Sequence, residues 1–153
     1  MWGGAWKRQQ KKMTPEQVNL VQQSFAKVAP ISEQAAVLFY DRLFEVAPSV
    51  KAMFPADMTE QRKKLMGTLA VVVNGLGNLG SVLPAASALA KRHVGYGAKP
   101  EHYPVVGGVL LWTLEKGLGE AWTSDVAEAW TAAYGTLSGY MISEAYGSTQ
   151  AAE

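Results

Sequence analysis

The amino-acid sequence predicts a single all-α domain built from six to eight helices. Apolar residues recur at helical spacing along most of the chain, and proline or glycine interrupts the pattern at intervals. No stretch has the pattern of a buried parallel strand. The length of 153 residues corresponds to about one domain. A composition with 48% hydrophobic and 18% charged residues is typical of a packed core and excludes a disordered chain.

The first predicted helix begins at a strong start signal. Thr14 suits the N-cap, Pro15 the first helical position, and Gln17 the closing position of a capping box. Apolar residues follow at positions 18, 21, 25 and 28, which form one helical stripe. Pro30 is expected to end this helix.

A second helix is expected to restart at Ser32. It includes the nearly all-apolar stretch 35–44, which is longer than a typical strand. Pro48 marks a tight corner after it. Phe54, followed by Pro55, ends the short segment beyond that corner.

Two central helices are predicted from their caps and apolar stripes. Thr59 is expected to cap the first, and Pro84 is expected in the first turn of the second. The inward positions are Gln61, Leu65, Leu69, Val72 or Val73, and Leu76 in the first helix, and Ala86, Leu89 and His93 in the second.

A GxGxxG motif at Gly75, Gly77 and Gly80 lies between these two helices. In a dinucleotide-binding fold this motif follows a strand, and an acid about 20 residues later ends a second strand. The acid at that spacing is Glu101, which lies in a loop with glycine and proline. We therefore favour a helix that continues through 71–73 and is ended by the glycines.

The last two helices follow a glycine-rich loop. Residues 102–118 are predicted to form a helix that stops at Gly119, and Thr123 or Ser124 is expected to cap the final helix. The inward positions are Val106, Leu110 and Leu114, and then Val126, Trp130, Ala133 or Tyr134, Leu137 and Met141.

Charge divides the chain into unequal parts. The first twelve residues hold four cations and no acid, so residues 13–153 carry −3, ten cations against thirteen acids. We interpret 1–13 as a basic, disordered extension, 14–147 as the domain and 148–153 as a short C-terminal tail. The extension could also contact acidic lipid through its tryptophans or reflect an upstream start. A domain at −3 is unsuited to nucleic acid.

Several classes are excluded by composition. The chain has no cysteine, so a disulfide scaffold, a thiolate zinc site and a cysteine nucleophile are excluded. No window of about 18 apolar residues is present, so no integral membrane segment is expected. The N-terminus lacks the apolar core of a secretion signal, and a cytoplasmic location is expected.

Three polar side chains, Tyr40, Gln61 and His93, lie on inward positions of three different predicted helices. A buried amide or hydroxyl without a partner costs about 1–3 kcal/mol. One interpretation is a shared polar object in an apolar cavity, such as haem with its bound ligand. The alternative is that each is a satisfied core or capping residue. His93 and His102 do not share a helix face in the manner of a two-histidine zinc site.

The sequence resembles the globin family over about residues 14–146. The resemblance is carried by the run Leu38-Phe-Tyr-Asp-Arg-Leu-Phe44 with Pro48 and Phe54 after it, by Arg92-His93, by the HYPVVG run that begins at His102, and by AWxxxYG from Ala129 to Gly135. The chain is most similar to bacterial single-domain globins related to the globin domain of flavohaemoglobins.

This resemblance implies a globin fold around a pocket for haem b. His93 would be the proximal ligand and the metal-binding residue, and its second ring nitrogen would donate a hydrogen bond. Tyr40 and Gln61 would hold the bound ligand on the distal side. The other residues implied to contact haem are Phe54, which would stack on the porphyrin, Leu65, Tyr103 and Val106, with Lys64 and Arg92 beside the propionates.

The implied function is reversible binding of O2, and also of CO and NO. Two hydrogen bonds to bound O2, each worth about 1.5–3 kcal/mol, would slow its release by roughly a hundredfold or more. NO dioxygenation to nitrate is the implied activity. Electrons would come from a separate reductase, because no reductase sequence follows Glu153.

One departure from the flavohaemoglobin pattern lies in the last helix. Those proteins have a proximal glutamate where this chain has Ala145, and Glu144 is one position away, about 100° around the helix. Two alternatives of other classes remain. One is a gas sensor, and the other is a haem-free regulatory or interaction module on the same fold.

Overall fold

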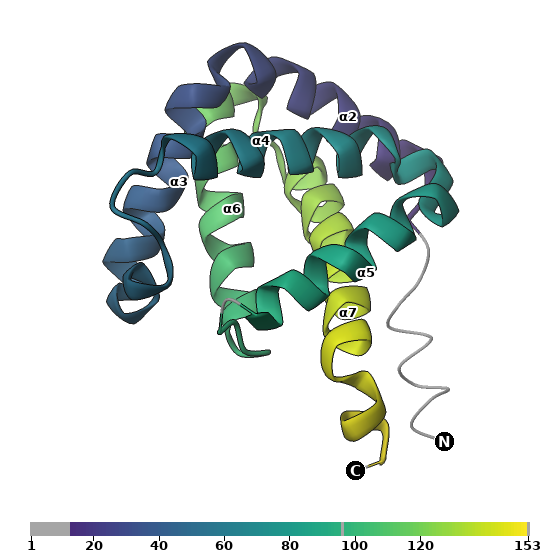
Figure 1. The fold of residues 1–153 in the computed structure, drawn as a ribbon. Coiled ribbons are helices and arrows are strands. Elements are labelled where there is room, and N and C mark those ends of the chain that lie inside the picture. The colour runs from purple at the N-terminus through teal and green to yellow at the C-terminus, as the bar shows by residue number, and fades with distance from the viewer. Residues whose placement is uncertain (1–12, 96, 153) are drawn as a thin grey trace.

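The computed structural model describes residues 13–95 and 97–152, and within them it confirms the all-α class with six α-helices (Figure 1). Residues 1–12, most of the predicted basic extension, lie outside the described residues. The helices are α2 (Pro15–Val28), α3 (Ser32–Val46), α4 (Thr59–Asn74), α5 (Leu79–Gly95), α6 (His102–Leu118) and α7 (Ser124–Ala152). Short 3-10 helices join them: η1 (Ala29–Ile31), η2 (Pro48–Met53), η3 (Leu76–Asn78) and η4 (Gly119–Ala121).

Most predicted helix ends are confirmed by local hydrogen bonds. The capping box is formed, since the Gln17 amide donates to the Thr14 hydroxyl at 3.1 Å and the Gln17 side chain accepts from the Thr14 amide at 3.0 Å. The Thr123 hydroxyl accepts from the Val126 amide at 3.2 Å, so Thr123 caps the last helix. That helix continues to Ala152, so the predicted tail at 148–153 is helical up to that residue.

Two predicted starts are wrong. Thr59 is the first residue of α4 and not its cap; its amide donates to the Asp57 carboxylate at 3.0 Å, so Asp57 satisfies the helix end. Pro84 lies inside α5, five residues after Leu79. The turn of η3 leads directly into α5, so the helix begins well before the proline.

The GxGxxG motif forms the corner between α4 and α5. Residues 71–73 are helical as predicted, and Gly75 is the C-cap of α4. A Cβ atom at Gly75 would stand 2.0 Å from Val82 Cγ2, whereas Gly77 has no atom within 4 Å of that position. Gly75 is therefore needed because α5 passes close to the end of α4.

The core lies where α2 and α3 pack on α6 and α7. Figure 1 shows α4 and α5 crossing in front of α6 and α7. Trp130 of α7 is 2% exposed, and its indole N–H donates to the Ser24 hydroxyl of α2 at 2.8 Å. Ser24 in turn donates to the Leu20 carbonyl at 2.7 Å. This buried polar link is fully satisfied, so it fixes α2 on α7 without a desolvation penalty.

No single helix in the described part of the chain is long and apolar enough to cross a membrane. One bent pair of helices, 59–74 with 76–95, meets the length and composition criterion only when taken together.

Candidate functional site

His93 is held in a defined orientation by its own helix. It lies near the end of α5 and is half-buried, and its Nδ1 is 2.8 Å from the carbonyl oxygen of Leu89, one turn earlier. A carbonyl can only accept, so Nδ1 carries the proton and donates. In a neutral imidazole with this tautomer, Nε2 holds the lone pair, which is the form that binds a metal ion. The helix therefore sets both the ring orientation and the nitrogen suited to coordination.

Tyr40 and Gln61 form a hydrogen-bonded pair between α3 and α4. The Gln61 side-chain amide donates to the Tyr40 hydroxyl oxygen at 3.1 Å. Tyr40 is 6% exposed, and burial raises the pKa of its hydroxyl while the bond from Gln61 partly opposes that rise. The phenol therefore stays protonated at neutral pH. Because its oxygen accepts from Gln61, its own proton is directed to another acceptor.

An aromatic cluster fixes the Tyr40 ring. Its centroid lies 5.0 Å from that of Phe39, 6.0 Å from that of Phe44 and 5.5 Å from that of Phe54. Phe54 directly follows η2, so the short corner after α3 returns this ring to the side of Tyr40. The pairs with Phe39 and Phe54 are edge-to-face, and such pairs contribute about 0.5–1.5 kcal/mol each beyond their buried area. The phenol is thus positioned by packing as well as by its hydrogen bond.

Tyr103, at the start of α6, lies next to His93. The two ring centroids are 6.5 Å apart with planes inclined by 36°. Tyr103 is 6% exposed, and among the described residues its hydroxyl has no hydrogen-bond partner. Burial, with a smaller effect from Tyr146, raises its pKa. A neutral, unpaired phenol therefore borders the imidazole.

Glu144 is the acid nearest in sequence to the proximal glutamate of the flavohaemoglobin pattern, and its carboxylate bonds to a serine of α5. The Glu144 carboxylate accepts from the Ser87 hydroxyl of α5 at 2.7 Å in an exposed position. Ala145 packs instead against the apolar cluster that includes Tyr103 and Met141. Tyr146 donates to the carbonyl of Ala98 and so ties α7 to the loop after α5. The carboxylate of Glu144 thus has a serine of α5 as a hydrogen-bond partner.

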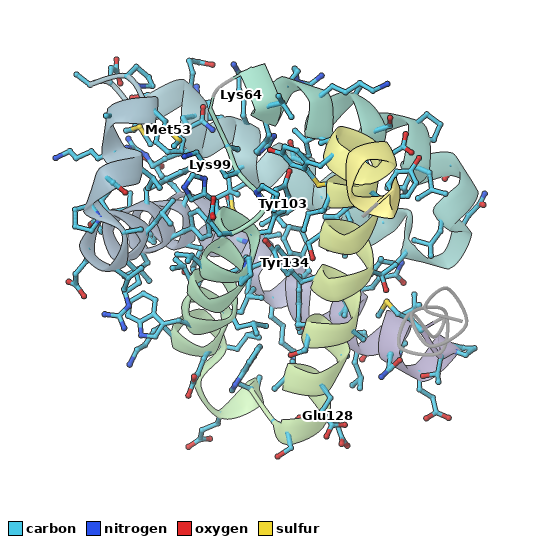
Figure 2. The ribbon with its side chains drawn as sticks, turned by 90° about the horizontal axis from the view of Figure 1, so that it is seen from below. Met53, Lys64, Lys99, Tyr103, Glu128 and Tyr134 are labelled. Carbon is cyan, nitrogen blue, oxygen red and sulfur yellow. The ribbon has the colours of Figure 1, made fainter. Side chains whose placement is uncertain are left out.

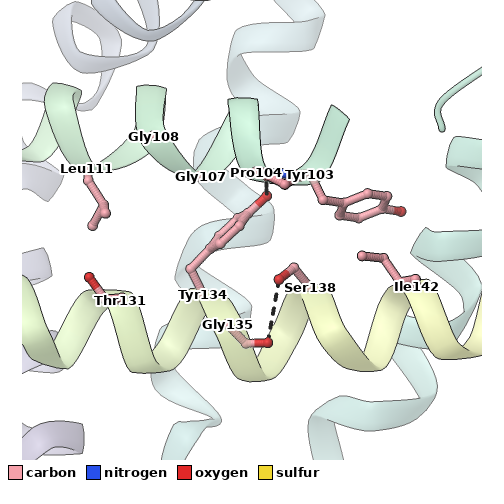
Figure 3. A pocket seen from close by; sticks show the side chains of 10 residues that line it. All are labelled: Tyr103, Pro104, Gly107, Gly108, Leu111, Thr131, Tyr134, Gly135, Ser138 and Ile142. Carbon is pink, nitrogen blue, oxygen red and sulfur yellow. Dashed lines mark hydrogen bonds between the residues drawn. The ribbon is translucent and has the colours of Figure 1, made fainter. Parts of the chain in front are cut away.

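The HYPVVG and AWxxxYG runs meet where α6 packs on α7. The Tyr134 hydroxyl donates to the Tyr103 carbonyl at 2.6 Å (Figure 3). A Cβ atom at Gly107 would stand 2.6 Å from Tyr134 Cε2, so the ring needs glycine there. Burial strongly raises the pKa of Tyr134. Gly107 is part of the HYPVVG run, and Tyr134 is also an inward position of the last predicted helix, but neither pattern predicts that the two residues are in contact.

The remaining predicted contact residues differ in burial. Phe54, Leu65 and Val106 are half-buried and pack against the main core. Lys64 and Arg92 are exposed, and neither forms an ion pair with any residue that the structure describes. The structure therefore brings Tyr40, Gln61 and Phe54 together, and His93 with Tyr103, whereas the two cations stay at the surface. Their role beside propionates stays a prediction.

These residues fit a porphyrin-held metal better than a bare ion. Within the described residues no group of three or more histidine, cysteine or acidic side chains could hold a metal ion. A metal at His93 would need its other ligands from a macrocycle, which haem supplies. The tautomer of His93 and the apolar surroundings of Phe54 and Leu65 suit that group.

The described residues thus form an all-helical domain with one carbonyl-oriented histidine and a partly buried phenol–amide pair. The family profile described as Globin matches residues 37–141. The chain belongs to the globin family, and globins in general bind haem and small gaseous ligands. The predicted fold and the family resemblance are thereby confirmed.

The similar proteins are bacterial. The chain is 34% identical over 133 residues to a flavohemoprotein of Rhodopirellula baltica, covering 85% of this chain and 33% of that one. It is 36% identical over 110 residues to a flavohemoprotein of Bacillus subtilis, covering 68% and 27%. The chain therefore matches about a third of the length of these curated relatives.

Among solved structures, a bacterial globin from Campylobacter jejuni superposes with a TM-score of 0.79 at 26% identity. The match covers 90% of this chain and 99% of the other.

Proposed function

We propose that this chain binds haem b through His93 and stabilises O2 with the Tyr40–Gln61 pair. The observation that carries the proposal is the 3.1 Å hydrogen bond between Gln61 and Tyr40, which brings two potential hydrogen-bond donors from different helices together. Bound haem would supply the iron that coordinates O2, CO or NO.

The proximal side would hold the iron through one imidazole. His93 donates from Nδ1 to the Leu89 carbonyl, which leaves Nε2 as the ligating nitrogen. The partner of Nδ1 is a neutral carbonyl and not a carboxylate. The imidazole would therefore keep its proton, and its donation of electron density to the metal would be moderate.

The distal side would hold the ligand by charge-directed hydrogen bonds. Tyr40 is neutral and buried, and its proton can be donated toward the pocket. Gln61 holds the phenol oxygen and can turn its amide toward the same acceptor. One donor to a partly charged acceptor contributes about 1.5–3 kcal/mol, so both together would slow O2 release by roughly a hundredfold or more.

Conversion of NO and O2 to nitrate is the activity we propose beyond ligand binding. It is supported by the similarity to flavohemoproteins, whose globin-like third this chain matches. The reaction consumes one electron per nitrate, since NO, O2 and an electron together give NO3−. The electron would come from a separate reductase.

The proposal is tested by absorption spectra of the purified protein in ferric, dithionite-reduced and CO-treated forms. A Soret band that shifts on reduction and again with CO is the expected result. No Soret band, even after addition of hemin, would contradict it and favour the haem-free interaction module. If haem is bound but nitrate does not form with a supplied reductant, ligand binding or gas sensing is the function instead.

A further inference from the structure

Positive charge is concentrated in two segments on either side of the proposed pocket. The first, residues 51–64, contains four cations and two acids; the second, residues 91–101, contains three cations and one acid. Together they carry +4. Residues 13–153 carry −3 in total, so the rest of the domain carries −7. The cations are Lys51, Arg62, Lys63, Lys64, Lys91, Arg92 and Lys99, and we call them the basic rim.

The basic rim follows the elements that carry the site. Residues 51–64 include the end of η2 and the first turns of α4, on which Gln61 lies. Residues 91–101 include the last turn of α5, with His93, and the loop after it. Figure 2 shows Met53, Lys64 and Lys99 toward one edge of the molecule and Glu128 at the opposite edge. The charge asymmetry is therefore spatial as well as sequential.

The rim has the composition of a transient interface. Six of its seven cations are exposed, and Arg62 is half-buried. Within the described residues the rim's one ion pair joins Lys63 to Glu60 at 3.9 Å, in a solvent-exposed position. Two apolar side chains lie among the cations, since Met53 is 37% and Val94 is 43% exposed. Charged groups around a small apolar centre give fast, steered association more than tight binding.

Bound haem would not cancel this charge. Its two propionates would neutralise at most two cations, and Lys64 and Arg92 are the ones predicted for that role. The other five rim cations still outnumber the three acids of the same segments. The rim stays basic while the rest of the domain is acidic.

We propose that the basic rim is the docking surface for an acidic electron-donor protein. The inference rests on the proposed function, because it supplies the electron that nitrate formation consumes. The reduced donor would lose one electron, and a haem iron bound through His93 would accept it, so that the donor is oxidised and the iron reduced by one equivalent each. The rim raises the encounter rate by attracting the donor's acidic surface to the edge of the site.

The test uses small redox probes of opposite charge on ferric, haem-loaded protein under anaerobic conditions. The probes are the dianion iron(II)–EDTA and the dication hexaammineruthenium(II). Reduction by the dianion is expected to slow by at least ~3-fold as salt rises, because salt screens attraction, and reduction by the dication is expected to speed up. Equal salt dependence for both probes would overturn the proposal. A protein without a Soret band would refute the proposed function instead.

Charge-reversal variants distinguish the effect of the rim from the effect of the protein's net charge. In the test variant Lys63→Glu is combined with Lys99→Glu, and in the control Lys27→Glu is combined with Lys116→Glu, so both change the net charge equally. All four side chains are exposed. The rim variant is expected to reverse the salt dependence for the dianion, and the control is expected to keep it. Indistinguishable variants would show that net charge, not the rim, directs the encounter.

A second readout does not depend on electron transfer. Poly-L-glutamate is titrated into 15N-labelled protein, and amide shifts are followed by NMR. Shifts concentrated in residues 51–64 and 91–101 are expected. Shifts spread over the surface, or concentrated on α7, would contradict the docking surface.

Discussion

Two tyrosines with equal burial lie in the two halves of the candidate site, and their hydroxyls differ in hydrogen bonding. Tyr40 and Tyr103 are each 6% exposed. Tyr40 accepts a hydrogen bond from Gln61, whereas the Tyr103 hydroxyl has no partner in the described part of the chain. The difference comes from the neighbouring helices, because α4 provides the Gln61 amide to Tyr40, whereas the described residues provide no partner to the Tyr103 hydroxyl. Burial alone therefore does not define what a phenol does here.

The largest expected effect is on the proximal side. His93→Ala removes the only side chain proposed to ligate the iron, so the protein should retain its helical circular dichroism and lose its Soret band. A matched control is His102→Ala, since His102, the first residue of α6, accepts from the Lys99 amide and should be dispensable for haem. If His93→Ala keeps a full Soret band, the assignment of the ligand is wrong.

The next effect distinguishes the two phenols. Tyr40→Phe should speed O2 release by about tenfold or more, because it removes a donor worth about 1.5–3 kcal/mol. Tyr103→Phe should change that rate by less than about twofold, because its hydroxyl is not placed to reach the ligand. Stopped-flow displacement of O2 by CO measures both. Equal effects of the two substitutions would remove the proposed distal mechanism.

A smaller effect on stability is expected where α6 meets α7. Tyr134→Phe breaks the 2.6 Å bond to the Tyr103 carbonyl and should lower the free energy of unfolding by about 1 kcal/mol. Tyr103→Phe removes a hydroxyl without a partner and should leave stability unchanged or slightly raised. Urea denaturation compares the two. A larger loss for Tyr103→Phe would reveal a partner that its hydroxyl uses in solution.

The smallest effect concerns alkaline pH. The pKa values of Tyr40, Tyr103 and Tyr134 are raised above the unfolded value of about 10, chiefly by burial. Above that value the unfolded chain loses these protons before the folded chain does, so stability is full below about pH 10 and falls as pH rises further. Urea midpoints from about pH 8 to 11 measure the slope. Tyr134→Phe should make the slope shallower, and an unchanged slope would contradict this account.

Helix identity was predictable from the sequence because the stripes and stop signals are local. The capping box at Thr14 and the helix 102–118 are present as predicted. The starts of α4 and α5 were not, since the N-cap of α4 is Met58, with Asp57 before it accepting from the Thr59 amide, and α5 follows directly on a 3-10 turn. Such starts depend on the conformation of the preceding backbone, and a pattern of residue propensities carries no information about that conformation.

The candidate site was predictable as a list of residues but not as a network. Inward register indicated Tyr40 and Gln61, yet their mutual hydrogen bond depends on how α3 and α4 cross. The Ser87–Glu144 bond lies between residues 57 positions apart, and no spacing rule predicts it. Likewise, the need for Gly107 arises only once the Tyr134 ring lies against it.

The close approach of Gly75 to Val82 fixes the corner between the two helices that carry Gln61 and His93. Gln61 lies fourteen residues before Gly75 on one helix, and His93 lies eleven residues after Val82 on the next. At 1.5 Å per residue, these helical segments are about 21 Å and about 16 Å long, and they meet near Gly75. A methyl group added at Gly75 would force the two helices apart at this corner, and their far ends would be displaced as well. The absence of a side chain at position 75 thus sets the separation between Gln61 and His93.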